Sequence, residues 1–168
     1  MRKLITLSAV SALTILLSSS AFGQPYVDPA GDEAFPNPHL DILSVEITQV
    51  ASDILFKIDL AGDPIATDWG KYLVAIDSVP GGDPIGNGWG RPISMPSGMD
   101  YWIGSWVDWG DGAEVYSFDG VAWNLDLASY NAPPDDMPFP VKTTNSVTLT
   151  TSLASLGLGV GDTFVFDV

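Results

Sequence analysis

The sequence predicts an all-β protein, an antiparallel β-sandwich of the jelly-roll kind. Apolar and polar residues alternate with a period of two in several short segments, which is typical of half-buried strands. Glycine, proline, aspartate and asparagine separate these segments at regular intervals. No long stretch shows the spacing of an amphipathic helix. Together these observations indicate sheets joined by turns.

The two clearest strands form one predicted hairpin. Apolar residues fall on one face at positions 43, 45 and 47, and again at positions 54, 56 and 58. The segment Ala51-Ser52-Asp53 between them has the length and composition of a hairpin turn. We therefore expect residues 43–48 and 54–59 to pair and to bury the faces that carry these apolar side chains.

The remaining elements follow in order. A glycine- and proline-rich loop is predicted at 78–98, a length that is usually functional or mobile. A second irregular loop surrounds the prolines at 133–140, and a short bend spans 153–158. The last segment has no closing turn, so either closing strands are missing or the segment docks as a terminal strand. Further strands are expected at 72–77, 100–109, 114–118, 121–125, 147–151 and 163–168.

Residues 1–23 have the organisation of a secretory signal peptide. Arg2 and Lys3 precede an apolar run over 4–17, and Ala21-Phe22-Gly23 forms a small-x-small cleavage site. A retained membrane anchor is the alternative, but the apolar run is short for a bilayer span. We expect a secreted or cell-surface protein with one domain over residues 24–168 and no membrane insertion after cleavage.

The charge and the cysteine content limit the classes of molecule that the protein is expected to bind. The chain has a formal net charge of −15 and no cysteine, so disulfides cannot stabilise it. The surface is expected to repel nucleic acid and anionic membranes and to favour divalent cations or neutral ligands. Solubility in a salty habitat is an alternative reason for the acidity. After the signal peptide the chain contains 21 acidic residues, and its only basic residues are Lys57, Lys71, Arg91 and Lys142.

Residues 28–60 also carry a family resemblance. The order D-P-x-G-D, a polar spacer, D-I-L-S-V-E and then D-I-L-F-K-I resembles the C-terminal binding module of glucodextranase and amylopullulanase-type enzymes. That module is similar to the family 9 carbohydrate-binding and DOMON-like β-sandwiches. The resemblance implies a secreted, non-catalytic sandwich with bound calcium, and it specifies no particular sugar.

A calcium site is predicted at the acidic turn that opens this stretch. Calcium takes six to eight oxygen ligands in flexible geometry. Asp28 and Asp32 flank a Pro-Ala-Gly turn, and Asp41 lies at the head of the next strand. The resemblance implies the same positions. Such aspartates also occur in plain turns, where they bind nearby N–H groups. A second acidic turn, Asp108, Asp111 and Glu114, is a weaker candidate.

The tryptophans predict a glycan-binding surface. In the strand at 100–109, Trp102, Trp106 and Asp108 share one face, and the opposite face is more continuously apolar. Trp89 and Arg91 lie in the long loop and would overhang this face beside Gly104. Aromatic rings stack on the C–H faces of sugars, and the polar groups bind hydroxyls. The alternative is that these rings are core or cover the sheet.

Nothing in the sequence indicates catalysis. His39 is the only histidine, so a Ser-His-Asp arrangement lacks support, and G-x-S-x-G is absent. Haem ligation by His39 with Met95 or Met99 has no supporting pattern. Two functions remain. The first is a calcium-stabilised carbohydrate-binding module, and the second is a structural cell-surface or matrix module with no sugar ligand.

Overall fold

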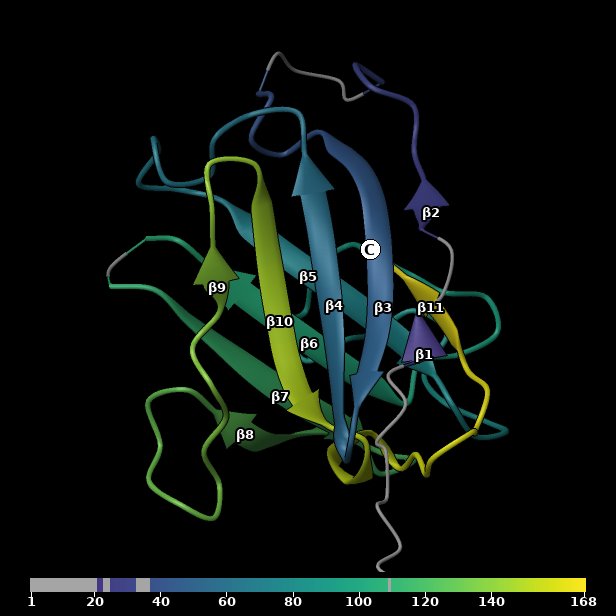
Figure 1. Ribbon diagram of the computed structural model, residues 1–168. Helices are drawn as coiled ribbons and strands as arrows, with labels where there is room; N and C mark the ends of the chain where they lie inside the picture. The colour runs from purple at the N-terminus through teal and green to yellow at the C-terminus, as the bar shows by residue number, and fades with distance from the viewer. Residues whose placement is uncertain (1–20, 23–24, 33–36, 109) are drawn as a thin grey trace, which may run out of the picture.

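The computed structural model is an antiparallel β-sandwich, which confirms the predicted all-β fold. It describes residues 21–22, 25–32, 37–108 and 110–168. Two sheets lie face to face (Figure 1). The first contains β1 (Ala21–Phe22), β2 (Tyr26–Val27), β3 (Ile42–Val50), β4 (Asp53–Leu60), β10 (Ser146–Ser152) and β9 (Val141–Lys142). The second contains β11 (Val165–Asp167), β5 (Lys71–Asp77), β6 (Tyr101–Trp106), β7 (Gly112–Phe118) and β8 (Trp123–Ala128).

The predicted hairpin is the centre of the six-stranded sheet. β3 and β4 pair antiparallel up to Val50 and Asp53, and Ala51 closes the turn with a left-handed φ of 56°. On β4, the apolar side chains at 54, 56 and 58 are almost fully buried, as their alternation predicts. β10 pairs with the other edge of β4 along its whole length.

The main core fills the space between the two sheets. It combines the buried face of β4 and β10 with side chains of β5, β6 and β7, among them Val74, Ile103 and Val115. The single turn of 3-10 helix at Ala154–Leu156 closes one end through Leu156. The last described segment docks in the second sheet, where β11 pairs with β5 and Phe166 packs on the core.

The loop at 78–98 folds over the outer face of the five-stranded sheet. There a second buried cluster forms from Ala75, Met95, Met99 and Trp102. Main-chain hydrogen bonds join Asp83 and Met99 in both directions. The buried Asn87 side chain also accepts from two loop N–H groups and donates to two loop carbonyls. This sheet is therefore covered on both faces along part of its length.

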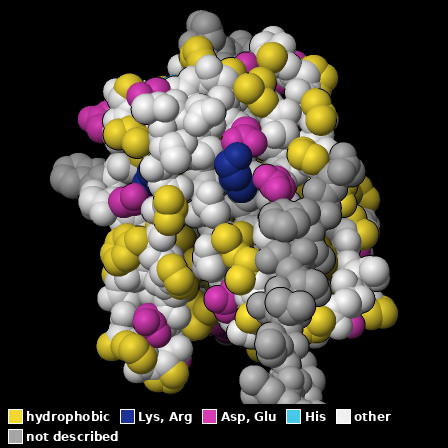
Figure 2. All heavy atoms as spheres, in the orientation of Figure 1, with side chains coloured by type: hydrophobic (Ala, Val, Ile, Leu, Met, Phe, Trp, Pro, Cys, Tyr) yellow, Lys and Arg dark blue, Asp and Glu magenta, His cyan; other side chains and the backbone are white. Residues whose placement is uncertain are grey.

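The outer face of the six-stranded sheet is different in character. In Figure 2, basic atoms lie between acidic atoms near the middle of this face, and hydrophobic atoms are spread in small groups. Lys57 on β4 forms an ion pair of 2.9 Å with Asp59. Among the described residues, no helix is long and apolar enough to cross a membrane.

The prediction and the structure differ mainly at element ends. β6 stops at Trp106, whereas the alternation suggested a strand to residue 109, and β8 begins at Trp123. The two-residue strands β2 and β9 were not predicted, because two residues show no period. Most of the predicted signal peptide lies outside the described residues, and Ala21–Phe22 pairs with the edge of β3.

Candidate functional site: an aromatic surface on the five-stranded sheet

β6 supplies the base of the candidate site. Its outward positions are Trp102, Gly104 and Trp106, because side chains alternate between the faces of a strand. Their neighbours on β5 are Ala75, Leu73 and Lys71, and their neighbours on β7 are Tyr116, Glu114 and Gly112. The two tryptophans thus lie on the face that the sequence pattern assigned to them.

Trp102 does not contribute an exposed ring. Its side chain is 0% exposed and packs with Met95 and Met99 beneath the long loop. Its indole Nε1 is buried and has no hydrogen-bond partner within the described chain. The expectation that Trp102 forms part of an open aromatic shelf is therefore wrong for this structure, because the folded loop replaces solvent above it.

Trp89 reaches the same face from the long loop. Its ring lies directly on Gly104, where an added Cβ would come within 2.4 Å of a ring carbon. Gly104 therefore makes room for the indole. Trp89 Nε1 donates a 2.7 Å hydrogen bond to Glu114, and the guanidinium of Arg91 lies 5.9 Å from the ring centroid. The side chain of Trp89 is half-buried, and Arg91 is exposed.

Trp106 continues the line of rings at the end of β6. Its ring occupies the space above Gly112, where a Cβ would meet a ring carbon at 2.2 Å. The ring centroid of Trp106 lies 6.0 Å from that of Trp89 and 6.3 Å from that of Tyr130. Tyr130 follows β8 and is 58% exposed. We call Trp89, Trp106 and Tyr130 the aromatic row.

Glu114 on β7 holds the row in place. Its carboxylate accepts hydrogen bonds from Trp89 Nε1, from the hydroxyl of Tyr116 at 3.0 Å and from the hydroxyl of Tyr130. The hydrogen bond to Glu114 is the main reason that the pKa of Tyr130 is raised to about 12. Burial is the main reason that the pKa of Tyr116 is raised to about 12, and Glu114 adds to it.

Charged pairs border the row on the side of Trp106. Lys71 pairs with Asp108, and this contact lowers the pKa of the Asp108 carboxyl. Lys142 on β9 pairs with Asp111 and also donates to the carbonyl of Trp106 at 3.1 Å. A residue of the six-stranded sheet thereby fixes the end of β6.

The charge balance of this surface differs from that of the chain. Three of the four basic residues in the described ranges, Lys71, Arg91 and Lys142, lie here. They balance the three carboxylates of Asp108, Asp111 and Glu114. The chain as a whole carries a formal net charge of −15. The aromatic row is therefore a locally neutral area on a strongly anionic protein.

The three aspartates that were predicted to bind calcium do not form a group of metal ligands in the structure. Asp28 and Asp32 are exposed, whereas Asp41 is buried. One oxygen of Asp41 accepts from the N–H of Gly31 at 2.8 Å, and the other is buried without a partner in the described chain. Nowhere among the described residues, which omit Glu33, do three metal-ligating side chains gather.

The three acidic side chains of the second acidic turn also do not form a metal site, because each has a different partner. Asp108 binds Lys71, Asp111 binds Lys142, and Glu114 binds the ring donors. Sequence reasoning missed Tyr130, and it named Glu114 only as a weak metal candidate, not as the residue that binds Trp89 and Tyr130. Their partners are 16 and 25 residues away along the chain, so no local pattern reveals them.

The fold and the site define a β-sandwich with a half-exposed aromatic row on one outer face. Comparisons with protein-family models, with curated proteins and with solved structures find no significant match to this chain. The resemblance of residues 28–60 to glucodextranase-type binding modules therefore stays a prediction.

Proposed function

We propose that this protein is a secreted, non-catalytic module that binds a neutral glycan on the aromatic row. The observation that carries the proposal is the line of three rings with centroid spacings of 6.0 and 6.3 Å. Two of these rings are half-buried, and the third is mostly exposed. Rigid aromatic side chains supply large contact areas at small entropic cost, which favours their use in binding surfaces.

The polar groups around the row suit a sugar. The C–H faces of the sugar would lie on Trp106 and Tyr130, and its hydroxyls would meet Arg91, Asp108 and Glu114. These charged groups are already positioned by their own partners, so little ordering is needed when a ligand binds. Because the local charges balance and the rest of the chain is anionic, a neutral glycan fits better than an acidic one.

Calcium binding at the acidic turn of residues 28–32, together with Asp41, is a separate proposal. One buried oxygen of Asp41 has no hydrogen-bond partner among the described residues, and this supports the proposal because a buried polar atom without a partner is costly. Calcium needs six to eight oxygens, so Asp28, Asp32 and main-chain carbonyls would have to complete the site. Calcium bound there, at a free concentration 100 times its dissociation constant, would stabilise the fold by about 2.7 kcal/mol. Thermal unfolding with and without calcium tests this, and Asp41→Asn should abolish the difference.

Affinity electrophoresis against a panel of neutral polysaccharides tests glycan binding. We expect at least one polysaccharide to retard the protein, and Trp106→Ala or Tyr130→Ala to remove most of the retardation. Trp69→Ala is the matched control, because this tryptophan is 47% exposed and packs on His39. Retardation by no polysaccharide would favour a structural cell-surface or matrix module. Equal loss in the Trp69 variant would place the ligand elsewhere.

A further inference from the structure

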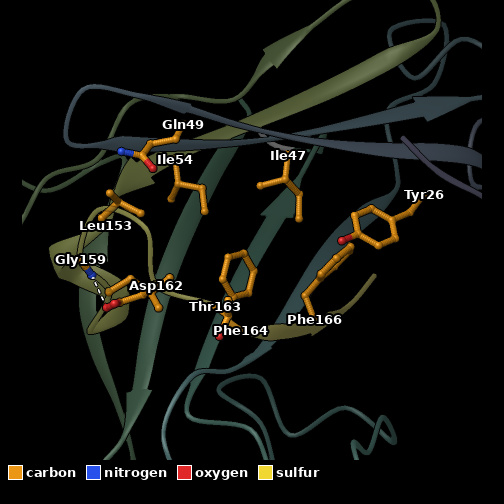
Figure 3. Close-up of a pocket in the computed structure, with 11 residues that line it drawn as sticks. Tyr26, Ile47, Gln49, Ile54, Leu153, Gly159, Asp162, Thr163, Phe164 and Phe166 are labelled. Carbon is orange, nitrogen blue, oxygen red and sulfur yellow. Dashed lines mark hydrogen bonds between the residues drawn. The ribbon is translucent and has the colours of Figure 1, made fainter. Parts of the chain in front are cut away.

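A cavity separate from the aromatic row lies in the seam between the two sheets. Its volume is about 320 Å³, within the range of roughly 300–1,000 Å³ that small-molecule sites occupy. Its walls come from β3, β4, the segment after the 3-10 turn, and β11 (Figure 3). None of the rings in the aromatic row lines it, so the two sites use different surfaces.

The walls of this seam cavity are apolar on both sides. Ile47 and Ile54 of the six-stranded sheet face Phe164 and Phe166 across it (Figure 3). Tyr26 lies at one end, where its ring meets Phe166 edge-on at a centroid distance of 4.7 Å. A ligand that fills the cavity would therefore remove substantial apolar surface from water, which is the main source of affinity in such sites.

The opposite end of the cavity is polar and rich in acceptors. Gln49 and Asp162 lie there beside Leu153 (Figure 3). The Gln49 amide nitrogen donates to the carbonyl of Ala51 at 3.1 Å, which leaves its amide oxygen as an acceptor. The Asp162 carboxylate accepts from the N–H of Gly159 at 2.8 Å and has no proton to donate when ionised. Among the described residues that line the cavity, none is basic.

We propose that the seam cavity binds a small apolar molecule that carries a hydroxyl or amine group. The apolar part lies between the isoleucines and phenylalanines, and the donor group meets Gln49 and Asp162. A carboxylate at the same position would face Asp162 on a protein with a net charge of −15. Two like charges this close together repel each other, which disfavours a ligand with a carboxylate at this end of the cavity. Solvent exposure of Asp162 reduces this, and we expect at least about tenfold discrimination.

Fluorescence with N-phenyl-1-naphthylamine tests the cavity, since this dye is apolar, uncharged and has one N–H donor. We expect saturable binding that Ile47→Phe weakens at least about tenfold, because the added ring fills the cavity. Val141→Phe, which adds the same ring at a position that is 61% exposed, is the control and should leave binding unchanged. No saturable binding, or full affinity in a folded Ile47→Phe variant, would overturn the proposal.

Displacement of the dye tests the head group. Decanol and decylamine, below their aggregation concentrations, should displace it at concentrations at least about tenfold lower than decanoate. Asp162→Asn should narrow this difference, and because its side chain is exposed the variant should fold normally. Equal displacement by all three, or no effect of Asp162→Asn, would overturn the assigned head group. Should Ile47→Phe fail to fold, the Asp162→Asn comparison still decides whether the ligand lies at this end.

Discussion

The two ends of the outer face of the five-stranded sheet contrast sharply, although one strand builds both. Trp102 and Trp106 lie four residues apart on the same face of β6. Trp102 is 0% exposed beneath Met95 and Met99, and its indole N–H has no hydrogen-bond partner in the described parts of the chain. Trp106 is half-buried, rests on a glycine and stands beside an exposed tyrosine. The strand determines which face a side chain occupies, and the loop determines whether that side chain is open to a ligand.

The same loop produces both outcomes. Between 93 and 99 it contributes apolar side chains that cover Trp102. Between 87 and 91 the loop is held by hydrogen bonds to the Asn87 side chain. This part contributes Trp89 and Arg91 to the end of the face that carries the aromatic row, which we call the open end. Glu114 then anchors Trp89 to the sheet. We therefore expect substitutions at the two ends to separate stability from binding.

The largest effect is expected from Trp102→Ala. Replacing a fully buried tryptophan by alanine leaves a large cavity and costs about 3–5 kcal/mol of unfolding free energy. Trp106→Ala, at a half-buried position, should cost clearly less and instead remove glycan binding. Denaturant unfolding of both variants measures the difference. Equal destabilisation by the two substitutions would show that Trp106 is a core residue like Trp102 and does not belong to a binding surface.

An intermediate effect is expected from Gly104→Ala. The new Cβ would lie 2.4 Å from the Trp89 ring, so the indole must move away from Glu114. Overpacking of this kind costs about 1–3 kcal/mol. Glycan binding should weaken as well, because the row is displaced. Gly159→Ala is the control, since its Cβ would find only ordinary contacts of 3.4 Å or more. Wild-type glycan affinity in the Gly104→Ala variant would show that Trp89 does not take part in binding.

The smallest effect on stability is expected from Glu114→Gln, which changes the titration of the tyrosines. The pKa of Tyr130 is raised from 10.0 to about 12, chiefly by its hydrogen bond to Glu114. The protonated phenol therefore stabilises the fold below pH 10, and this contribution is lost as the pH rises towards 12.

Removing the charge of Glu114 should bring the pKa of Tyr130 back towards 10. Tyr72, whose pKa is raised to about 12 by burial, should not change and serves as an internal reference. Carbon NMR of the tyrosine rings during an alkaline titration follows each residue. A Tyr130 titration unaffected by the substitution would contradict the role of Glu114 as the anchor of the row.

The sequence was a good guide where structure depends on local periodicity. Alternation located the β3–β4 hairpin and the correct faces of β4 and β6, because burial on one face imposes a period of two. It also placed Trp89 beside Gly104. It could not show that the loop buries Trp102, since that depends on how Asn87 and Asp83 fold the loop onto the sheet.

Long-range partners were the other limit. Tyr130 joins the row through contacts with Trp106 and Glu114, which lie far away along the chain. The cavity between the sheets likewise combines β3 with residues more than 100 positions later. The acidic turn predicted Asp28, Asp32 and Asp41 as calcium ligands, but the sequence did not reveal that Asp41 is buried while Asp28 and Asp32 stay exposed.

Binding at the aromatic row can be observed directly by a nitrogen–proton NMR titration of the indole N–H groups with a fragment of the polysaccharide that retards the protein most. We expect the signals of Trp89 and Trp106 to shift with a common dissociation constant. The Trp102 signal should stay in place and exchange slowly with solvent, because that N–H is buried. Shifts at Trp69 or Trp102 with an unchanged Trp106 signal would contradict the claim that the open end of this sheet is the binding surface.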